Sequence, residues 1–181
     1  MKLTHKKVCH ELNTVEPVEY LIKDLFPPEE QEPIERLLKL AENPMVNFWA
    51  FYDEDVFCGM TYVVESKDTL FGLYLAIPKE FQSKGYGTYI INHIREILNG
   101  KDLVIHVEDP DQESPNQEQR RRRIKLYKKL GFMDTGYRIN GEDTVFLLMS
   151  TAEDFKIKTY FDLMHDYSYG EYTPPVYKVE E

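Results

Sequence analysis

The chain has 181 residues and a mass of 21.5 kDa, which suits one domain that can bury a core of its own. Hydrophobic residues make up 42% of the chain and charged residues 30%, which is typical of a globular protein and gives no compositional sign of disorder. The formal net charge of -10 disfavours nucleic acid as a partner and would attract cationic ligands.

The first residues, MKLTHKKVCHEL, lack the apolar middle of a secretory signal. No apolar run approaches the roughly 20 residues that a membrane-spanning helix needs. We therefore expect a cytoplasmic protein with no membrane partner. Cys9 and Cys58 are too few for a metal cluster or a disulfide framework, so we expect reduced structural thiols and no metal.

Residues 17–44 carry apolar side chains at helical spacing, interrupted by Pro27 and Pro28. This pattern predicts two short helices with a sharp break, covering one side of a sheet. The runs MVNFWAFY, VFCGMTYVV and TLFGLYLAI follow; they are rich in β-branched and aromatic residues and are separated by polar turns. They predict an antiparallel meander of three strands.

The stretch EFQSKGYGTYI, residues 80–90, joins the third strand to a predicted helix that ends at Asn99 and Gly100. The helix has one apolar face, formed by Ile90, Ile91, Ile94, Ile97 and Leu98. Residues 102–107, DLVIHV, are again strand-like. The order strand, glycine turn, helix, strand predicts a right-handed crossover between two parallel strands.

A polar loop then precedes a second helix, for which we expect Ser114 as the cap, Pro115 at the first position and Gln117 to close a capping box. This helix is predicted to end at Leu130 and Gly131. Asn140 and Gly141 lie between two further strand runs and indicate a hairpin.

Residues 151–181 form a tyrosine-rich, acidic extension to the domain predicted over residues 1–150. Its aromatic side chains can pack on that domain or on a second copy in a homodimer. The extension can also simply cover an open sheet edge.

The glycine turn has the features of an anion site. The first N–H groups of a helix have no partner and lie at the positive end of the helix dipole. Gly85 and Gly87 can adopt positive φ and leave room for a phosphate oxygen, while Lys84 adds charge and Gln82 a side-chain donor. A pyrophosphate would fit there. The Walker pattern is absent, and the dinucleotide fingerprint requires a small residue where Ile90 stands.

QSKGYGTYIINHIREIL resembles the Q/R-x-x-G-x-G/A signature of the GNAT superfamily of N-acetyltransferases, and IKLYKKLGF, residues 124–132, resembles its tyrosine-bearing helix and LGF ending. The resemblance covers residues 17–150. It implies the α+β or α/β fold of an acyl-CoA N-acyltransferase. This fold is one three-layer domain whose mixed, mostly antiparallel sheet of six to seven strands has helices on both faces.

The resemblance also implies acetyl-CoA as the acetyl donor. Its pyrophosphate would lie on the backbone N–H groups of residues 84–88, and its pantetheine arm would pair with Leu75 to Ile77 where that strand splays from residues 103–107. The cofactor-binding residues implied are Leu75, Ala76, Ile77, Gln82, Ser83, Lys84, Gly85, Tyr86, Gly87 and Thr88. Arg120 departs from the family pattern because it stands where members often carry an Asn that contacts the arm. The run of four arginines at 120–123 can reach a phosphate of CoA or form a solvated face.

Transfer of acetyl to an amine needs a proton acceptor, because a free alkylamine has a pKa of about 10.4. Strand alternation places His106 and Glu108 on one face at the end of the strand. Glu108 is the candidate general base, and Asp109 is a rival. A base that acts through a water molecule is equally compatible with the sequence. Both carboxylates can instead be solvated loop groups. Tyr127 is the candidate general acid for the departing thiolate, a role that the resemblance assigns to it; the alternative is a core aromatic. The backbone N–H near Ile77 would polarise the carbonyl.

Three functions follow from these patterns. The first is an N-acetyltransferase that forms a ternary complex and acts on a cationic small-molecule amine, or alternatively on a peptide or protein amine. The second is a non-catalytic acyl-CoA-binding regulatory module. The third is a nucleic-acid or protein interaction domain that uses the arginine run and the aromatic C-terminal extension. The acceptor pocket is expected between the two leading helices and the closing hairpin, near Tyr20, Trp49, Tyr137 and residues 27–32.

Overall fold

The computed structural model describes residues 3–141 and 144–179. These residues form eight β-strands and five α-helices, arranged in two compact units. The first unit contains residues 3–65 and 72–100, and the second contains residues 66–71 and 101–179. The extension after residue 150 therefore belongs to the second unit, and a division at residue 150 stays a prediction. None of the described helices is long and apolar enough to cross a membrane.

The first unit is built on strands in the order β1-β2-β3-β4. Their bounds are β1 Leu3–Lys7, β2 Val46–Asp53, β3 Val56–Glu65 and β4 Thr69–Ala76, of which the residues from Gly72 onward lie in this unit. β1 pairs antiparallel with β2, and β2 with β3. The predicted strand runs of the meander are confirmed. β1 was not expected, because Leu3 is the one buried residue of a strand that is otherwise polar and lies at the sheet edge.

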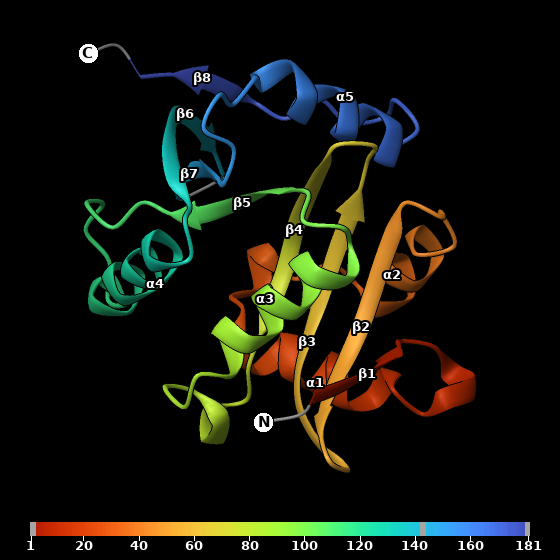
Figure 1. Cartoon of the computed structure of the whole chain (residues 1–181). Helices are drawn as coiled ribbons and strands as arrows, with labels where there is room; N and C mark the ends of the chain where they lie inside the picture. Colours follow the sequence, from red (N-terminus) through yellow and green to blue (C-terminus); the bar gives the residue numbers. More distant parts are fainter. Residues whose placement is uncertain (1–2, 142–143, 180–181) are drawn as a thin grey trace. The chain divides into compact units, whose positions relative to one another are not determined.

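Helices cover both faces of these strands (Figure 1). The predicted helix pair is confirmed as α1 Val15–Leu25 and α2 Ile34–Leu40, which the proline break separates. Tyr62 of β3 reaches the carbonyl of Leu37 in α2 at 3.5 Å. Gly59, three residues earlier on the same strand, faces Ile90 of α3, which spans Tyr86–Ile97. Because neighbouring residues of a strand point to opposite faces, α2 and α3 lie on opposite sides.

The second unit contains strands in the order β5-β7-β6-β8, and each neighbouring pair is antiparallel. Their bounds are β5 Asp102–Glu108, β6 Met133–Asn140, β7 Val145–Ser150 and β8 Val176–Lys178. The predicted hairpin is confirmed, since Asn140 pairs with Val145. Residues 142 and 143 of its turn lie outside the described residues.

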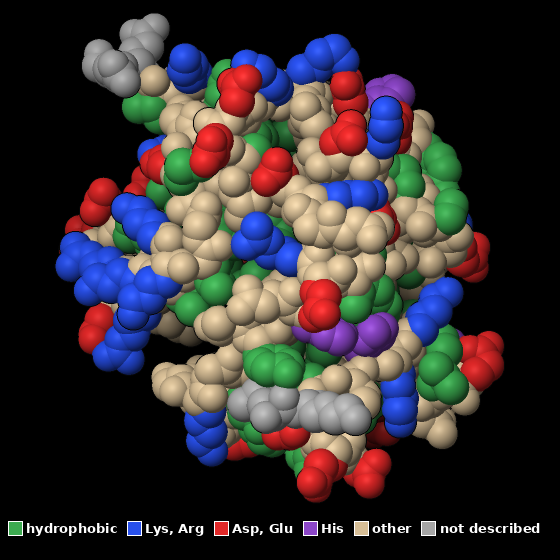
Figure 2. Space-filling model, in the orientation of Figure 1, with side chains coloured by type: hydrophobic (Ala, Val, Ile, Leu, Met, Phe, Trp, Pro, Cys, Tyr) green, Lys and Arg blue, Asp and Glu red, His purple; other side chains and the backbone are tan. Residues whose placement is uncertain are grey.

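Helix α4, Gln117–Lys129, packs on β5. The predicted capping box is wrong: the N-cap is Asn116, without a side-chain cap, and the side chain of Gln117 donates to the carbonyl of Pro110 at 3.2 Å. The reason is a turn over residues 114–117, in which the N–H of Gln117 donates to the carbonyl of Ser114. The helix end is confirmed, with Gly131 at φ 89°. Basic side chains gather on the outer face of α4 (Figure 2), and those exposed are Arg121, Arg122, Lys125, Lys128 and Lys129.

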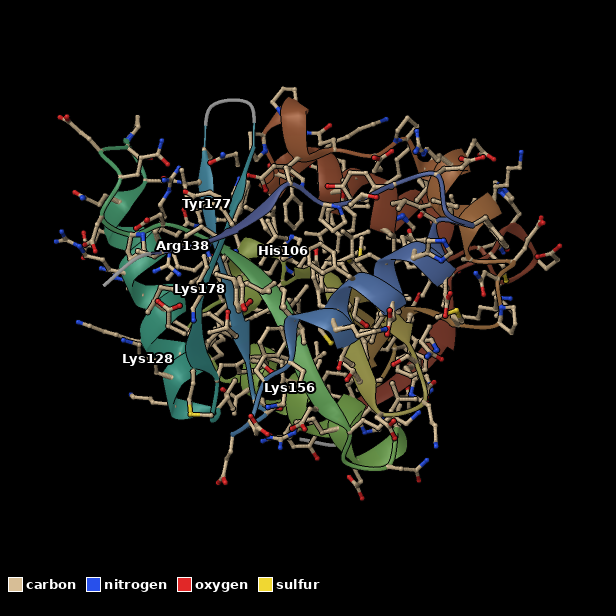
Figure 3. All side chains as sticks on the ribbon, turned by 90° about the horizontal axis from the view of Figure 1, so that it is seen from above. His106, Lys128, Arg138, Lys156, Tyr177 and Lys178 are labelled. Atoms are coloured by element: carbon tan, nitrogen blue, oxygen red, sulfur yellow. The ribbon has the colours of Figure 1, made fainter. Side chains whose placement is uncertain are left out.

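The C-terminal extension forms α5, Ile157–Tyr167, and β8. The apolar face of α5 is buried, and it consists of Tyr160, Leu163, Met164 and Tyr167. β8 pairs with β6, so that Tyr177 lies opposite Arg138, and Figure 3 shows these two residues beside Lys178. The extension thus covers the β6 edge in its own chain, which was one of the alternatives. Self-association stays a prediction.

Candidate functional site

The glycine turn before α3 is exposed over residues 82–85. Gly85 is the N-cap of α3 with φ 91° and ψ -5°, in the left-handed region that favours glycine. Apart from its chain neighbours and the backbone of α3, no described atom lies within 4 Å of the position that a Cβ on Gly85 would take. The N-cap makes no side-chain hydrogen bond to the first N–H groups of α3. This is the arrangement expected of a helix N-terminus that accepts a phosphate.

Two side chains of the turn hold it in place. The phenol of Tyr86 donates to Asp53 Oδ2 of β2 at 2.6 Å, and this hydrogen bond, with burial, raises the pKa of Tyr86 to about 12. Gln82 Nε2 donates to the carbonyl of Ile77 at 2.9 Å. Gln82 was predicted to offer its side chain to the ligand. In the structure one N–H of that amide ties the turn to the end of β4, and the contact of Gln82 with the ligand stays a prediction. Exposed Lys84 and the backbone N–H groups are further donors.

The end of β4 lies close to β3 because of Gly59. A Cβ on Gly59 would lie 2.9 Å from both the Ala76 carbonyl oxygen and Ile77 Cδ1, closer than Cβ contacts allow. Leu75 and Ile77 are half-buried, whereas Ala76 is buried. The residues predicted to bind the cofactor, 75–77 and 82–88, thus lie together in the first unit, connected by the contact between Gln82 and Ile77.

The predicted catalytic residues belong to the second unit, and Glu108 there is the centre of a buried ion cluster. Its Oε1 lies 3.0 Å from Arg120 Nη2, and its Oε2 lies 2.7 Å from Arg123 Nη2. Asn116 Nδ2 also donates to Oε1, at 3.3 Å. The side chains of Glu108 and Arg120 are each 7% exposed. We call Glu108, Arg120 and Arg123 the ion cluster.

The contacts within the ion cluster favour a structural role for Glu108 over the base role. Both of its carboxylate oxygens already accept charge-assisted hydrogen bonds, and a proton would have to displace one of them. The carboxylate of Asp109 lies outside the ion cluster, and its Oδ1 accepts a hydrogen bond from the N–H of Asp111 at 2.8 Å. The assignment of the base to Glu108, Asp109 or water stays a prediction.

Tyr127 lies one helical turn after Arg123 on α4 and is half-buried. Its ring packs edge-on against Phe132, with centroids 5.4 Å apart. Burial raises the pKa of Tyr127 above its ordinary value, while the positive charge of Arg123 acts in the opposite direction. A neutral phenol at neutral pH is what a proton donor requires. Tyr127 therefore remains the candidate general acid.

His106 lies on the predicted face of β5 with Glu108, but its side chain contacts the C-terminal extension. Its Nε2 lies 2.7 Å from the hydroxyl of Tyr160 in α5, and its ring lies 4.7 Å from that of Phe71. Burial lowers the pKa of His106 to about 3, so the ring is neutral at physiological pH. The imidazole is a packing and hydrogen-bonding group that anchors α5.

Sequence reasoning missed two residues that support the site, Asp53 and Gly59, and it did not predict the contact of Arg123 with Glu108. The arginine run was noticed, but periodicity alone could not show that Arg120 is buried on Glu108 while Arg122 is exposed and paired with Glu118. For Asp53 and Gly59 the partners lie 33 and 17 residues away, at Tyr86 and Ala76. No local signal identifies such contacts.

One protein family and several solved structures resemble this chain. A family model described as an acetyltransferase (GNAT) domain matches residues 44–134, half of the chain. Comparison with curated protein sequences finds no match. Among solved structures, a Bacteroides thetaiotaomicron protein assigned to the GNAT family of acetyltransferases has a TM-score of 0.70 at 23% identity, covering 94% of this chain and 99% of that one.

Two further structures share the fold at lower identity. The ribosomal-protein-S18-alanine N-acetyltransferase of Escherichia coli has a TM-score of 0.64 at 14% identity, covering 86% of this chain and 99% of that one. An aminoglycoside 6'-N-acetyltransferase in complex with coenzyme A has a TM-score of 0.65 at 15% identity, covering 81% of this chain and 95% of that one.

The chain belongs to the GNAT family of acetyltransferases. It is an N-acetyltransferase with acetyl-CoA as the donor, and its fold class is the predicted α+β class, with eight strands in the described residues where six to seven were expected. The additional strands are β1 and β8, at the two ends of the chain. Among the described residues, no group of three or more potential metal ligands lies together.

Proposed function

We propose that this chain moves acetyl from acetyl-CoA to the primary amine of a cationic small molecule, by direct attack in a ternary complex. The observation that carries the choice of acceptor is a groove in the first unit, with a volume of about 670 Å³. One side of it is α1, with Glu16, Tyr20 and Asp24, and the other is residues 78–80. Pro78 directly follows Ile77, where the pantetheine arm is expected to end.

The lining of this groove suits a cation. Lys79 Nζ and Asp24 Oδ1 form an ion pair at 2.9 Å, so these two charges offset each other. Glu16 and Glu80 remain as carboxylates, and the ring of Tyr20, 72% exposed, offers a face for a cation. The groove differs from the expected pocket: the ring of Trp49 lies 4.8 Å from that of His5, and Tyr137 belongs to the second unit.

The chemistry assigns one task to each group. Acetyl-CoA supplies an activated thioester. The amine nitrogen forms the new amide bond as the carbon–sulfur bond breaks, and the sulfur leaves with the electron pair as a thiolate. In our proposal, Tyr127 gives that sulfur its proton, and Asp109, Glu108 or water accepts the proton that the amine loses. The turn at Gly85 and the end of β4 hold the donor substrate in place.

A thiol-release assay over a panel of amines tests this proposal. The panel contains polyamines, aminoglycosides, amino acids and peptide N-termini, each with acetyl-CoA. We expect turnover with one or more of the cationic small molecules, and loss of that turnover when Glu16 and Glu80 are both changed to Gln. Turnover with peptides alone would make the acceptor a protein amine, and no turnover with any amine would overturn the proposal.

A further inference from the structure

The ion cluster holds more positive than negative charge. Two guanidinium groups, of Arg120 and Arg123, meet the single carboxylate of Glu108, which leaves one positive charge in excess. Arg120 also donates to the carbonyl of Asp109 at 3.3 Å, but the buried Nε atoms of both arginines have no hydrogen-bond partner among the described residues. The Arg123 side chain is 36% exposed and that of Arg120 is 7% exposed, so the excess positive charge is only partly screened by water and can act on neighbouring groups of α4.

The proposed role of Tyr127 presents a difficulty of its own. A thiol has a pKa of about 8.5 and a phenol one of about 10, so complete transfer of the phenol proton to a thiolate is uphill. Burial raises the pKa of Tyr127 and makes this proton transfer more unfavourable. A general acid works best when the phenolate that it leaves behind is stabilised.

We propose that Arg123, held in place by Glu108, is a positioning residue for Tyr127, and that its guanidinium stabilises the charge on the phenol oxygen as the proton moves to the departing sulfur. The phenol O–H bond breaks, an S–H bond forms, and the phenolate regains a proton from solvent. This inference rests on the proposed function. It explains why the ion cluster has an excess positive charge beside the proton donor.

The geometry supports this assignment in two ways. Arg123 and Tyr127 are four residues apart on α4 and are therefore neighbours on one helix face. Side chains in a helix point back toward its N-terminus, so Tyr127 extends toward the turn that carries Arg123. The 2.7 Å contact with Glu108 restrains the guanidinium in that turn. The charged group that acts on Tyr127 is Arg123 from α4, which is paired with Glu108 from β5, while Phe132 contributes an uncharged ring.

The experiment measures the ionisation of Tyr127 directly. The full chain is produced with 3-fluorotyrosine, which lowers the phenol pKa into a range where the protein stays folded, and its fluorine resonances are followed against pH without substrate. The resonance that disappears in Tyr127→Phe belongs to Tyr127. The variants are Arg123→Gln, Arg123→Lys and Glu108→Gln, with Arg122→Gln as the matched control, because Arg122 is an exposed neighbour paired with Glu118.

We expect Arg123→Gln to raise the Tyr127 pKa by about one unit, and Arg123→Lys to restore most of the difference. Glu108→Gln removes the negative charge but keeps a side-chain oxygen that accepts from Arg123, so the guanidinium stays in place and the Tyr127 pKa should fall. Opposite signs from two partners of one ion pair would not arise from a purely structural role. Should Arg123→Gln fail to fold, the Glu108→Gln and Arg123→Lys titrations still decide the question.

Equal Tyr127 pKa values in the wild type, Arg123→Gln and Glu108→Gln would overturn the inference. In the thiol-release assay, Arg123→Gln should lower kcat about tenfold with little change in the KM for acetyl-CoA, and Arg122→Gln should leave both unchanged. The titration needs no turnover. A protein that shows the titration shifts but acetylates no amine would therefore refute the proposed function and leave the electrostatic coupling in place.

Discussion

At the scale of single residues, the second unit contains two neighbouring polar groups on β5 with different surroundings. Glu108 is surrounded by guanidinium groups, and His106 by the aromatic rings of Phe71 and Tyr160. A buried carboxylate is tolerated because it is paired, whereas a buried imidazole is tolerated because it is neutral. Glu108 therefore contributes ion pairs to the protein, whereas His106 contributes packing and a hydrogen bond.

Tyr127→Phe tests the proton donor. It removes the hydroxyl and keeps the ring contact with Phe132, so folding and acetyl-CoA binding should persist while kcat falls about 10²-fold or more. Stopped-flow kinetics and calorimetry with acetyl-CoA measure the two effects separately. The control is Tyr169→Phe, because Tyr169 is 71% exposed. Unchanged kcat in Tyr127→Phe would remove Tyr127 from the mechanism.

His106 should make stability depend on pH. Its folded-state pKa of about 3 lies below the unfolded value of about 6.5, so the stability it contributes is complete above pH 6.5 and is lost as the pH falls toward 3. Between pH 7 and pH 5 we expect the free energy of unfolding to drop by about 2 kcal/mol from this group. Urea denaturation of the wild type and His106→Phe measures it. The slope should decrease in the variant and persist in His10→Gln, whose imidazole is exposed.

At the scale of elements, α3 has a glycine with positive φ at each end, and the two ends differ in what they face. Gly85 at the N-terminus has φ 91° and Gly100 after the C-terminus has φ 66°, and no other described atom lies within 4 Å of a Cβ at either. An alanine would be strained at both positions by about 1 kcal/mol. The N-terminal end alone presents N–H groups to an anion.

Comparing Gly85→Ala with Gly100→Ala therefore separates stability from cofactor binding. Both variants should lose a similar amount of unfolding free energy in thermal or urea denaturation. Only Gly85→Ala should weaken acetyl-CoA binding, by about tenfold, because the added methyl group and the altered turn disturb the phosphate site. Equal acetyl-CoA affinities in the two variants would argue that the diphosphate is bound elsewhere.

At the scale of the whole molecule, charge is unevenly distributed along the chain. The net charge is -10, yet α4 carries seven basic residues and one acidic residue in its sequence, QEQRRRRIKLYKK. The remainder of the chain is correspondingly more acidic, and this charge would attract the cationic acceptor that we propose.

Ionic strength tests this steering. For a cationic acceptor, kcat/KM should fall several-fold between about 0.01 M and 0.15 M salt, since the Debye length shortens from about 30 Å to about 8 Å. A neutral amine acceptor of similar size should show little change, and kcat at saturation should change little for either. A salt dependence that is the same for both acceptors would contradict electrostatic attraction of the acceptor.

Sequence alone determined the features that depend on local chemistry. The proline break between α1 and α2, the strand runs of the meander, the Gly131 stop of α4 and the turn at Gly85 follow from preferences of neighbouring residues, and all were predicted. The turn at Gly85, which we expect to hold the pyrophosphate, was recognisable for the same reason: an anion site of this kind depends on bare backbone at the start of a helix, and the glycine spacing indicates that backbone.

Tertiary structure decided what depends on distant partners. β1 and β8 exist because β2 and β6 offer edges, although three-residue β8 and polar β1 have little pattern of their own. Glu108 was one of the candidate bases, and only the structure shows that Arg120 and Arg123, on the next helix, contact both of its oxygens. Hydrogen bonds and ion pairs between segments far apart in sequence leave no periodic signal, so only the folded chain shows which polar groups are occupied and which remain available for chemistry.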